Sequence, residues 1–384
     1  MIILTTILIC ITIAVGLVYL FTIVMFGFGW LSIPFLRYQK SESYIFASVI
    51  IPVRNEKNNI IRCLESVLAQ HYQPDYFEII IVDDHSTDNT SDIIKSKYSS
   101  CKNIILISNQ GQGKKDAITS AIKIAKGEII ITLDADCVVE QHWLASFIEY
   151  YKATNAKMIV GSVKLLYSHS VFTRMQSLEF MALSLTTGGA LAFNNAVLCN
   201  GANLAFTREV FNQVNGYQDI DSYATGDDVL LMYKINQQFP QSIKFLKSRY
   251  AIASTYAQPT VSGFVQQRRR WASKKFSDLN TETKLTSLTV FFFSFFLLLL
   301  PFTALVTPHI TFFNYSIIQI WMIIFVAKCI IDFWILYMAT SFFREKTLLL
   351  FFLPEQIIYL FYIVIIGLMG RARTYSWKER TYNE

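Results

Sequence analysis

The chain has 384 residues, of which 53% are hydrophobic and 31 are phenylalanine. This composition is too apolar for one ordinary soluble fold, and the length allows about two domains. The net charge of +6 suits an anionic membrane surface or phosphate ligands. Nucleic acid is not an expected partner, because the arginine cluster at 268–270 stands just before a hydrophobic block. We therefore predict a membrane protein with one soluble domain.

The apolar residues lie at both ends of the chain, and most of the charge lies between them. We predict an N-terminal transmembrane anchor at 1–33, a soluble domain at 44–276, about three membrane helices within 285–370 and a basic tail at 371–384. The first segment has neither the basic start nor the small-residue cleavage site of a signal peptide, and basic residues follow it. An uncleaved anchor in the inner or plasma membrane, with the soluble domain in the cytoplasm, fits this charge asymmetry.

The sequence leaves open on which side of the membrane the chain ends. One anchor and three further spans would place the C-terminus outside, whereas the basic residues of 371–384 favour the inside. Either the positive-inside rule fails at this tail, or one apolar segment is re-entrant or interfacial.

Lys328 and Asp332 are four residues apart within the middle predicted membrane helix, so they can form an ion pair on one face. Ionisable residues at this depth are costly and usually face protein or water. A structural ion pair is the default interpretation. The alternative is that both residues line a path for a lipid or a glycan.

Within the soluble domain, two carboxylates follow an apolar run at 129–133, which is typical of a buried parallel strand. Asp134 and Asp136 stand at its carboxyl end, where open α/β sheets bind their ligands. In an extended segment, side chains two residues apart point the same way, so both carboxylates can meet one cation. Such oxygen ligands suit Mg²⁺ or Mn²⁺ that is also bound to substrate phosphates. The alternative is a polar strand end that caps the next helix.

Two earlier strands also end in polar residues. A predicted strand at 44–53 is followed by a polar turn and a helix, and a second strand at 76–82 is followed by Asp83 and Asp84. This order is the βαβ pattern of a parallel sheet. Carboxylates accept the N–H and hydroxyl donors of a base or a ribose, so both aspartates are candidate nucleotide contacts.

Lys114 follows two glycines at the start of another predicted helix. Backbone N–H groups at a helix start, together with a lysine, form a plausible phosphate contact. The G-x-x-x-x-G-K-[ST] spacing of a Walker A loop is absent, so a kinase or ATPase is disfavoured.

The second half of the soluble domain adds two candidate groups. Gly201 and Asn203 belong to a small-residue turn that enters a strand, where the glycine could simply serve close packing. Asp227 and Asp228 precede an apolar run that is typical of a helix start, where carboxylates are favoured electrostatically.

A Gln-x-x-Arg-Trp motif stands close to the second apolar region, formed by Gln267, Arg270 and Trp271. The arginine can meet pyrophosphate oxygens, and the indole can form one wall of an acceptor site. The alternative is a basic interfacial helix, with Arg268 and Arg269 on anionic lipid. We favour the site for the three motif residues.

Four spaced motifs resemble, in their order, the nucleotide-binding half of the family 2 inverting glycosyltransferases: Pro52-Val-Arg-Asn-Glu56, Asp83-Asp84-x-Ser-x-Asp88, Gly113-Lys114 and Asp134-x-Asp136. The resemblance covers about residues 45–275. It implies an α/β nucleotide-sugar transferase domain of the GT-A type, with a Rossmann-like mixed sheet, in addition to the transmembrane helices.

The resemblance also implies a role for each motif. The first segment and the paired aspartates would hold the uridine of a UDP-sugar: Pro52, Asn55, Glu56, Asp83 and Asp84. Lys114 would lie by the diphosphate, and Asp134 and Asp136 would bind Mg²⁺ or Mn²⁺ on it. The turn with Gly201 and Asn203 would lie under the donor sugar and the acceptor.

An inverting transfer needs one further carboxylate, because a base must take the proton of the attacking acceptor hydroxyl. In the family, the aspartate nearer the helix has this role. Alignment on the leucine that follows assigns it to Asp228, with Asp227 as the weaker candidate.

Two branches of the family fit this organisation. One makes β-linked glycans, as cellulose, hyaluronan and chitooligosaccharide synthases do, and the other adds one sugar to a lipid, as ceramide glucosyltransferases do. We favour the first because Gln-x-x-Arg-Trp follows three acidic motifs. The expected partners are a UDP-sugar, a glycan or lipid acceptor, the bilayer, and a homo-oligomer or export partner. A transporter or receptor with a degenerate domain would lack these carboxylates, and a dolichol-type sugar-phosphate transferase would not need the Gln-x-x-Arg-Trp motif.

Overall fold

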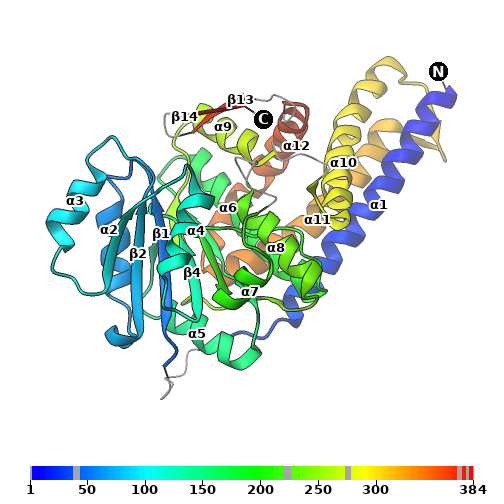
Figure 1. Ribbon diagram of the computed structural model, residues 1–384. Coiled ribbons are helices and arrows are strands. Elements are labelled where there is room, and N and C mark those ends of the chain that lie inside the picture. Colours follow the sequence, from blue (N-terminus) through cyan, green and yellow to red (C-terminus); the bar gives the residue numbers. More distant parts are fainter. Residues whose placement is uncertain are drawn as a thin grey trace.

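Figure 1 shows the computed structural model of the chain, in which a sheet-based domain packs against a group of long helices. The described residues are 2–37, 44–218, 226–272 and 278–369, with the backbone of 374–377 and 380–383. The helices are α1 (Ile2–Ser32), α2 (Ile60–Leu68), α3 (Thr90–Tyr98), α4 (Lys114–Ile124), α5 (Trp143–Thr154), α6 (Val171–Ala192), α7 (Arg208–Gln213), α8 (Asp227–Gln238), α9 (Val261–Ala272), α10 (Thr281–Val306), α11 (Ile317–Phe343) and α12 (Phe352–Met369), with short 3₁₀ helices η1 (Pro74–Tyr76) and η3 (Lys346–Phe351).

The strands are β1 (Ala47–Val53), β2 (Phe77–Asp83), β3 (Ile104–Ser108), β4 (Ile129–Leu133), β5 (Val138–Val139), β6 (Met158–Val160), β7 (Val163–Leu166), β8 (Asn203–Thr207), β9 (Ile243–Phe245), β10 (Ala253–Tyr256), β11 (Thr311–Phe312), β12 (Tyr315–Ser316), β13 (Thr374–Trp377) and β14 (Arg380–Asn383). In the described part of the chain, seven of them form one sheet in the order β3-β2-β1-β4-β8-β6-β9. β5, β10 and β7 form a smaller sheet.

The direction of each strand explains where the polar loops meet. β1 pairs in parallel with β2 and β4, whereas β8 runs antiparallel to β4 and β6. This mixed sheet confirms the predicted α/β class. Leu133 at the end of β4 pairs with Asn203 at the start of β8, so the turn before β8 adjoins the carboxyl end of β4. The loops after β1, β2 and β4 therefore share one edge with this turn.

The two faces of the sheet bury separate apolar cores. Along β1, Val49 and Ile51 face a core with α2, α3 and α5, and Ile50 faces a second core with α4, α6, α7 and α8. The second core continues to Trp30 of α1 and to the last turns of α11. The sheet-based domain and the long apolar helices are thus joined by shared apolar packing.

Helix α6 has no counterpart in the sequence-based prediction. Its buried residues surround the helix, so the sequence shows no amphipathic pattern that would indicate it. The helix packs closely on α1 through glycines: a Cβ added to Gly189 would overlap the carbonyl oxygen of Phe26, and one added to Gly29 would overlap that of Gly189. Small residues allow two helix backbones to approach in this way.

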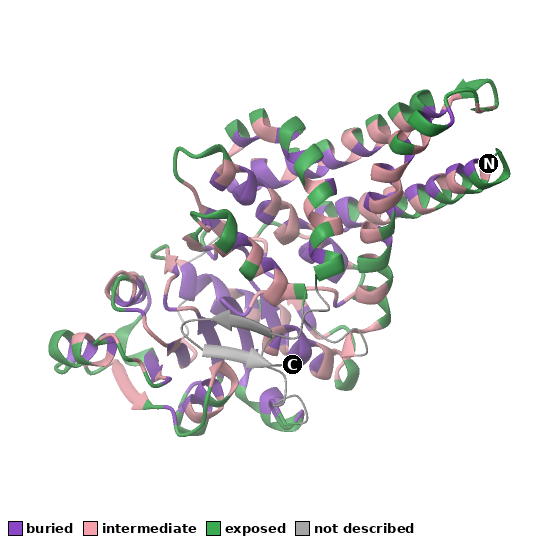
Figure 2. Ribbon diagram, turned by 90° about the horizontal axis from the view of Figure 1, so that it is seen from above, coloured by how far each residue is buried: buried purple, intermediate pink, exposed green. Residues whose placement is uncertain are grey.

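Four described helical segments are long and apolar enough to cross a membrane: Ile2–Ser32, Thr281–Val306, Ile317–Phe343 and Lys346–Met369. Figure 2 shows exposed residues along the outer surfaces of these helices, which suits contact with lipid. Pro301 lies inside α10, whereas Pro354 falls in the first turn of α12, where its missing N–H interrupts no intrahelical hydrogen bond.

The segment formed by η3 and α12 returns to the soluble domain at both ends. Before it, the Glu345 carboxylate pairs with Lys164 of β7. After it, the hairpin of β13 and β14 lies beside α9 (Figure 1). Both ends of this segment therefore contact the sheet-based domain. The predicted basic tail at 371–384 lies outside the described residues, except for the backbone of these two strands.

Candidate active site

The carboxyl edge of the sheet borders a cavity of about 570 Å³. Loops after β1, β2 and β4, the turn before β8, and helices α6, α8 and α9 form its walls. Twelve of the predicted site residues line it: Pro52, Glu56, Asp84, Lys114, Asp134, Asp136, Gly201, Asp227, Asp228, Gln267, Arg270 and Trp271. The structure thus brings together residues that are up to 219 positions apart in the sequence, and three predicted residues (Asn55, Asp83 and Asn203) fall outside the cavity wall.

Asp84 connects the loop after β2 to the start of α4. Its carboxylate is 4% exposed, and Oδ1 accepts hydrogen bonds from Asn109 Nδ2 at 2.8 Å and from Gly113 N at 2.9 Å. Gly113 has a φ of +91°, a conformation that favours glycine. These contacts fix the first turn of α4, so that Lys114 projects into the cavity.

Asp83 and Asn55 shape the loops behind the cavity wall. Asp83 accepts hydrogen bonds from Ser86 N at 3.2 Å and from Ser91 Oγ at 2.6 Å, within its own loop and the helix that follows. Asn55 Oδ1 accepts a hydrogen bond from Thr87 N at 2.8 Å, which ties the loop after β1 to the loop after β2. Sequence spacing could not separate Asp83 from Asp84, because both follow the same strand.

Asn203 is likewise a structural residue. It is fully buried, its Oδ1 accepts a hydrogen bond from Trp143 Nε1 at 2.9 Å, and its Nδ2 donates to the carbonyl oxygens of Ser162 and Ala251 at 2.7 and 2.8 Å. The side-chain amide therefore ties β8 to α5 and to the loops before β7 and β10. The predicted substrate contact of Asn203 is thus not supported by its position.

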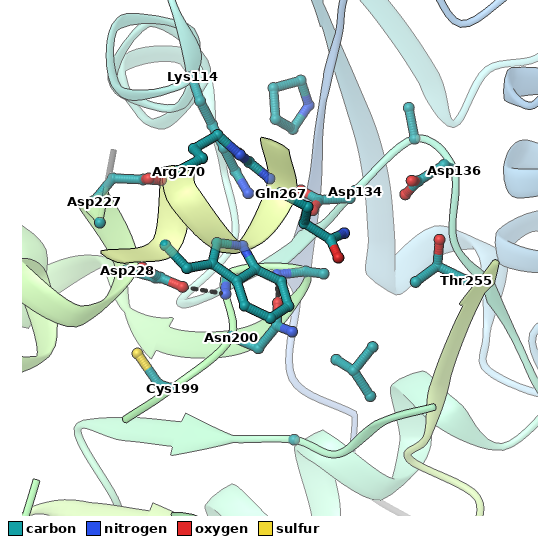
Figure 3. Close-up of a pocket in the computed structure, with 18 of the residues that line it drawn as sticks. Lys114, Asp134, Asp136, Cys199, Asn200, Asp227, Asp228, Thr255, Gln267 and Arg270 are labelled. Atoms are coloured by element: carbon teal, nitrogen blue, oxygen red, sulfur yellow. Dashed lines mark hydrogen bonds and ion pairs between the residues drawn. The ribbon is translucent and has the colours of Figure 1, made fainter. Parts of the chain in front are cut away.

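Lys114 lies among carboxylates from two parts of the fold, the loop after β4 and the start of α8 (Figure 3). Its Nζ donates to Asp134 Oδ1 at 2.6 Å. Burial alone would lower the pKa of Lys114, but the charges of Asp134, Asp227 and Asp228 outweigh it and raise this pKa above its ordinary value. The lysine therefore stays protonated at neutral pH, where it can attract the phosphates of a ligand.

Asp134 and Asp136 both line the cavity, as their i, i+2 spacing predicts. In the part of the chain that the structure describes, no three His, Cys, Asp or Glu side chains form a metal site by themselves. However, Mg²⁺ in proteins is usually bound by only one or two carboxylates, and phosphates of the bound ligand supply further oxygens. The Lys114 ammonium against Asp134 also shows that this carboxylate accepts a cation. The two residues fit a divalent ion that reaches the site with a diphosphate.

Asp227 and Asp228 begin α8 at the opposite side of the cavity (Figure 3). Asp228 Oδ2 accepts a hydrogen bond from Gly201 N, and its Oδ1 accepts one from Val229 N, both at 2.8 Å. Burial is the main cause that raises the pKa of Asp227, and the negative charges of Asp228 and Asp134 raise it further against the opposing effect of Lys114. Asp228 is thus held in one orientation, and Asp227 is the carboxyl whose ionised form the site disfavours.

Helix α9 lies across the cavity and carries the Gln-x-x-Arg-Trp motif. Figure 3 shows Gln267 and Arg270 over the same space that Lys114 and Asp134 enter. Among the described residues, nothing donates a hydrogen bond to the buried Oε1 atom of Gln267. A buried acceptor without a donor is costly, so this atom is suited to a hydroxyl or an amide of a ligand.

The alternative of a lipid-facing basic helix is wrong for Arg268. This side chain is 5% exposed, and its Nη2 donates to Glu179 Oε2 of α6 at 2.6 Å. The sequence did not indicate this pairing, because the helix that carries Glu179 was not predicted.

Helix α6, the segment between it and β8, and strands β7 and β9 supply further cavity residues that the sequence analysis missed. They include apolar side chains and two hydroxyl groups: Leu165, Phe180, Leu183, Ser184, Thr187, Leu198 and Phe245. None of them belongs to a motif, and the sequence could have indicated them only through the position of α6.

Comparisons with known proteins agree with this arrangement. Residues 48–214 match the family model described as glycosyl transferase family 2. A poly-beta-1,6-N-acetyl-D-glucosamine synthase of Staphylococcus epidermidis is 29% identical over 268 residues, which are 67% of this chain and 60% of that protein. A dolichyl N-acetyl-alpha-D-glucosaminyl phosphate 3-beta-D-2,3-diacetamido-2,3-dideoxy-beta-D-glucuronosyltransferase of Methanococcus voltae is 38% identical over 109 residues, 28% of this chain and 34% of that protein. The alignments thus span less than two thirds of these relatives.

Among solved structures, the mannosyltransferase PcManGT from Pyrobaculum calidifontis, in complex with GDP-Man and Mn²⁺, aligns with 95% of this chain and 99% of its own. The TM-score is 0.57 and the sequence identity is 18%, so the likeness concerns the fold alone. The neighbour supports the GT-A fold with helices attached to it.

Proposed function

We propose that this chain, which contains a family 2 glycosyltransferase domain, transfers a sugar from a UDP-sugar to a growing β-linked glycan at the membrane. The observation that carries the proposal is the convergence of Lys114, Asp134, Asp136 and Asp228 on one cavity at the carboxyl edge of the sheet. A cation, a pair of metal-binding carboxylates and a separate carboxylate are the groups that transfer from a nucleotide sugar requires.

The donor would lie along the cavity from the loops after β1 and β2 towards α8. Glu56 and Asp84 line the end of the cavity that we assign to the uridine, because carboxylates accept hydrogen bonds from base and ribose donors. Lys114 and Arg270 enter the middle of the cavity, where two cations suit the diphosphate. A divalent ion bound through Asp134 and Asp136 would offset the charge that grows on the leaving diphosphate.

The chemical step is a single displacement at the anomeric carbon. The acceptor hydroxyl forms a new bond to this carbon, the bond from carbon to diphosphate oxygen breaks, and the hydroxyl proton passes to a carboxylate. We assign the proton to Asp228, since the N–H groups of Gly201 and Val229 hold its carboxylate in one orientation beside the cavity. Trp271 and Gln267 would then bound the acceptor side, with the indole as an apolar wall.

Transfer of one sugar to a membrane lipid is the second candidate. The apolar side chains Phe180 and Leu183 line the cavity from α6, which itself packs on the membrane helix α1. An apolar wall beside a membrane helix would suit an acceptor with a lipid part. The glycan acceptor remains our first choice, because the site also presents the Gln-x-x-Arg-Trp motif on α9.

Release of UDP from UDP-N-acetylglucosamine and UDP-glucose, by membranes that carry the protein, tests the donor and the metal. We expect release with Mn²⁺ or Mg²⁺, its loss with excess chelator, and its return when the ion is added back. The Asp134→Asn variant should need a higher ion concentration, because one of two carboxylate ligands is gone. Full activity in chelator would contradict the metal assignment, and inactivity with both donors under all conditions would contradict the proposed donor class.

A further inference from the structure

A chain of buried polar side chains runs through the helical bundle. Tyr19 of α1 donates to Asp332 Oδ1 at 2.8 Å, and Lys328 Nζ donates to Asp332 Oδ2 at 2.6 Å, which is the predicted pair of α11. Lys328 also donates to Gln356 of α12, whose Nε2 donates to Glu355 at 2.9 Å. Lys328 is fully buried and sits within protein contacts. This supports the structural interpretation of the pair over a path for a lipid or a glycan.

A second polar group joins α12 to the helix over the active site. Glu179 of α6 accepts a hydrogen bond from Arg268 of α9 at 2.6 Å and another from the hydroxyl group of Tyr362 of α12. Three helices therefore meet at one carboxylate. Tyr362 also contacts Phe264 of α9 edge-on, with ring centroids 5.5 Å apart.

Tyr359 connects the two polar groups along α12. Its ring lies 5.3 Å from Lys328 Nζ on one side and 5.4 Å from the ring of Tyr362 on the other. Contacts thus run without a break from Tyr19 in α1, through α11 and α12, to Arg268 in α9. The bundle is in this way connected to the helix that covers the cavity.

The position of Arg268 is poorly suited to stability alone. Among the described residues, its buried Nε and Nη1 atoms find no hydrogen-bond acceptor, and unpaired buried donors are unfavourable. Its guanidinium lies instead 4.3 Å from the ring of Trp271 and 4.7 Å from that of Phe264. Phe264, Arg268 and Trp271 follow the i, i+4, i+7 spacing of one helix stripe, and Trp271 at its end lines the cavity.

We propose that Arg268 and Glu179 are positioning residues, which with Tyr362 hold α9 in the orientation that places Gln267, Arg270 and Trp271 over the cavity. The proposal rests on the proposed function, since it concerns the same reaction. Arg268 does not line the cavity itself. It acts through its contact with the ring of Trp271 and through the packing of α9 on α6 and α12. The membrane helices therefore help to set the geometry of the active site.

The chain offers a matched control for this carboxylate. Glu345, after α11, also accepts hydrogen bonds from one cation, Lys164, and one tyrosine, Tyr167. It too joins the soluble domain to the membrane region, but it contacts neither α9 nor the cavity. Glu345→Gln therefore removes the same kind of interaction, a carboxylate that accepts from one cation and one tyrosine, at a contact that does not involve α9.

The test compares Tyr362→Phe and Glu179→Gln with Glu345→Gln in the full chain. The loss of a hydrogen bond to a charged group corresponds to about tenfold in a binding constant. We expect the KM for UDP-N-acetylglucosamine or UDP-glucose to rise by about that factor in the first two variants, because Arg270 leaves its place, and to stay unchanged in the control. A smaller folded fraction would lower turnover without raising KM. Arg268→Lys keeps the charge, so its KM should lie between that of the wild-type chain and that of Arg268→Gln.

Hydrogen–deuterium exchange supplies a readout that requires no activity. In Tyr362→Phe and Glu179→Gln, amides of 261–272 should exchange faster, whereas those of 227–238 should not change. Unchanged KM with unchanged exchange in 261–272, or equal effects in Glu345→Gln, would overturn the proposal. If the wild-type chain turns over neither donor, the proposed function fails, and exchange in 261–272 still decides whether the three residues dock α9.

Discussion

Replacing Asp228 with asparagine tests the proposed base, and the structure predicts its cost. Each carboxylate oxygen of Asp228 accepts a backbone N–H group, from Gly201 and from Val229. An amide has one acceptor oxygen, so one of these N–H groups would face an NH₂ group instead. We expect Asp228→Asn to destabilise the protein by about 1–3 kcal/mol. Turnover should fall by at least about 10²-fold, because the amide cannot take a proton.

Asp227→Asn, one residue earlier, should have the opposite effect on stability. The pKa of Asp227 is raised in the folded protein, chiefly by burial, so its ionised form destabilises the fold above that pKa. The amide removes this cost, and the melting temperature of Asp227→Asn should exceed that of wild type at pH 8. The gain should disappear only as the pH falls below the ordinary pKa of an aspartic acid, about 3.9, because Asp227 is then protonated in both the folded and the unfolded state.

Turnover measured as UDP release at neutral pH, together with melting temperatures from pH 8 down to about pH 3, checks both variants side by side. The reasoning is refuted if Asp228→Asn keeps turnover within about threefold of wild type, since a lost general base costs about 10²-fold or more. Lower turnover in Asp227→Asn than in Asp228→Asn would transfer the role of base to Asp227.

Two further substitutions test the packing of the membrane helices. Gly189→Ala places a methyl group against the carbonyl oxygen of Phe26, so α6 must move away from α1. The unfolding midpoint in detergent should fall by the equivalent of about 1–3 kcal/mol. An unchanged midpoint would show that the two helices are not in close contact. Lys328→Met leaves Asp332 buried without its cation, which should cost about 3–5 kcal/mol, and the further change Asp332→Asn should restore part of the loss. No recovery in the double variant would argue against the ion pair.

The sequence predicted the site well where chemistry follows directly from a strand end. Asp84 and Asp134 stand one residue beyond β2 and β4, and parallel strands bring their carboxyl ends to one edge, so the local pattern already determines where these side chains meet. Asp83 and Asp84 illustrate the limit of this reasoning. A single residue decides which of them lines the cavity, and that depends on hydrogen bonds such as those from Ser91 and Asn109.

The acceptor side was less predictable, because it depends on packing between segments far apart in the chain. Helix α6 carries no alternating pattern, since its sides face α1, α11 and the sheet. Because α6 was not predicted, the sequence did not indicate that Glu179 pairs with Arg268, and the basic segment at 268–270 resembled a lipid-binding helix. Asn203 lies in a turn of the expected kind, but its burial follows from the position of Trp143, 60 residues earlier.

The most direct test of the central claim is the fate of labelled sugar from UDP-N-acetylglucosamine and UDP-glucose, supplied with Mn²⁺ to membranes that carry the wild-type chain or Asp228→Asn. Label should enter an insoluble polymer with the wild-type chain and be lost with the variant. Label that appears instead in the organic extract would contradict the glycan acceptor and establish transfer to a lipid. Polymer formed equally well by Asp228→Asn would contradict the proposed site.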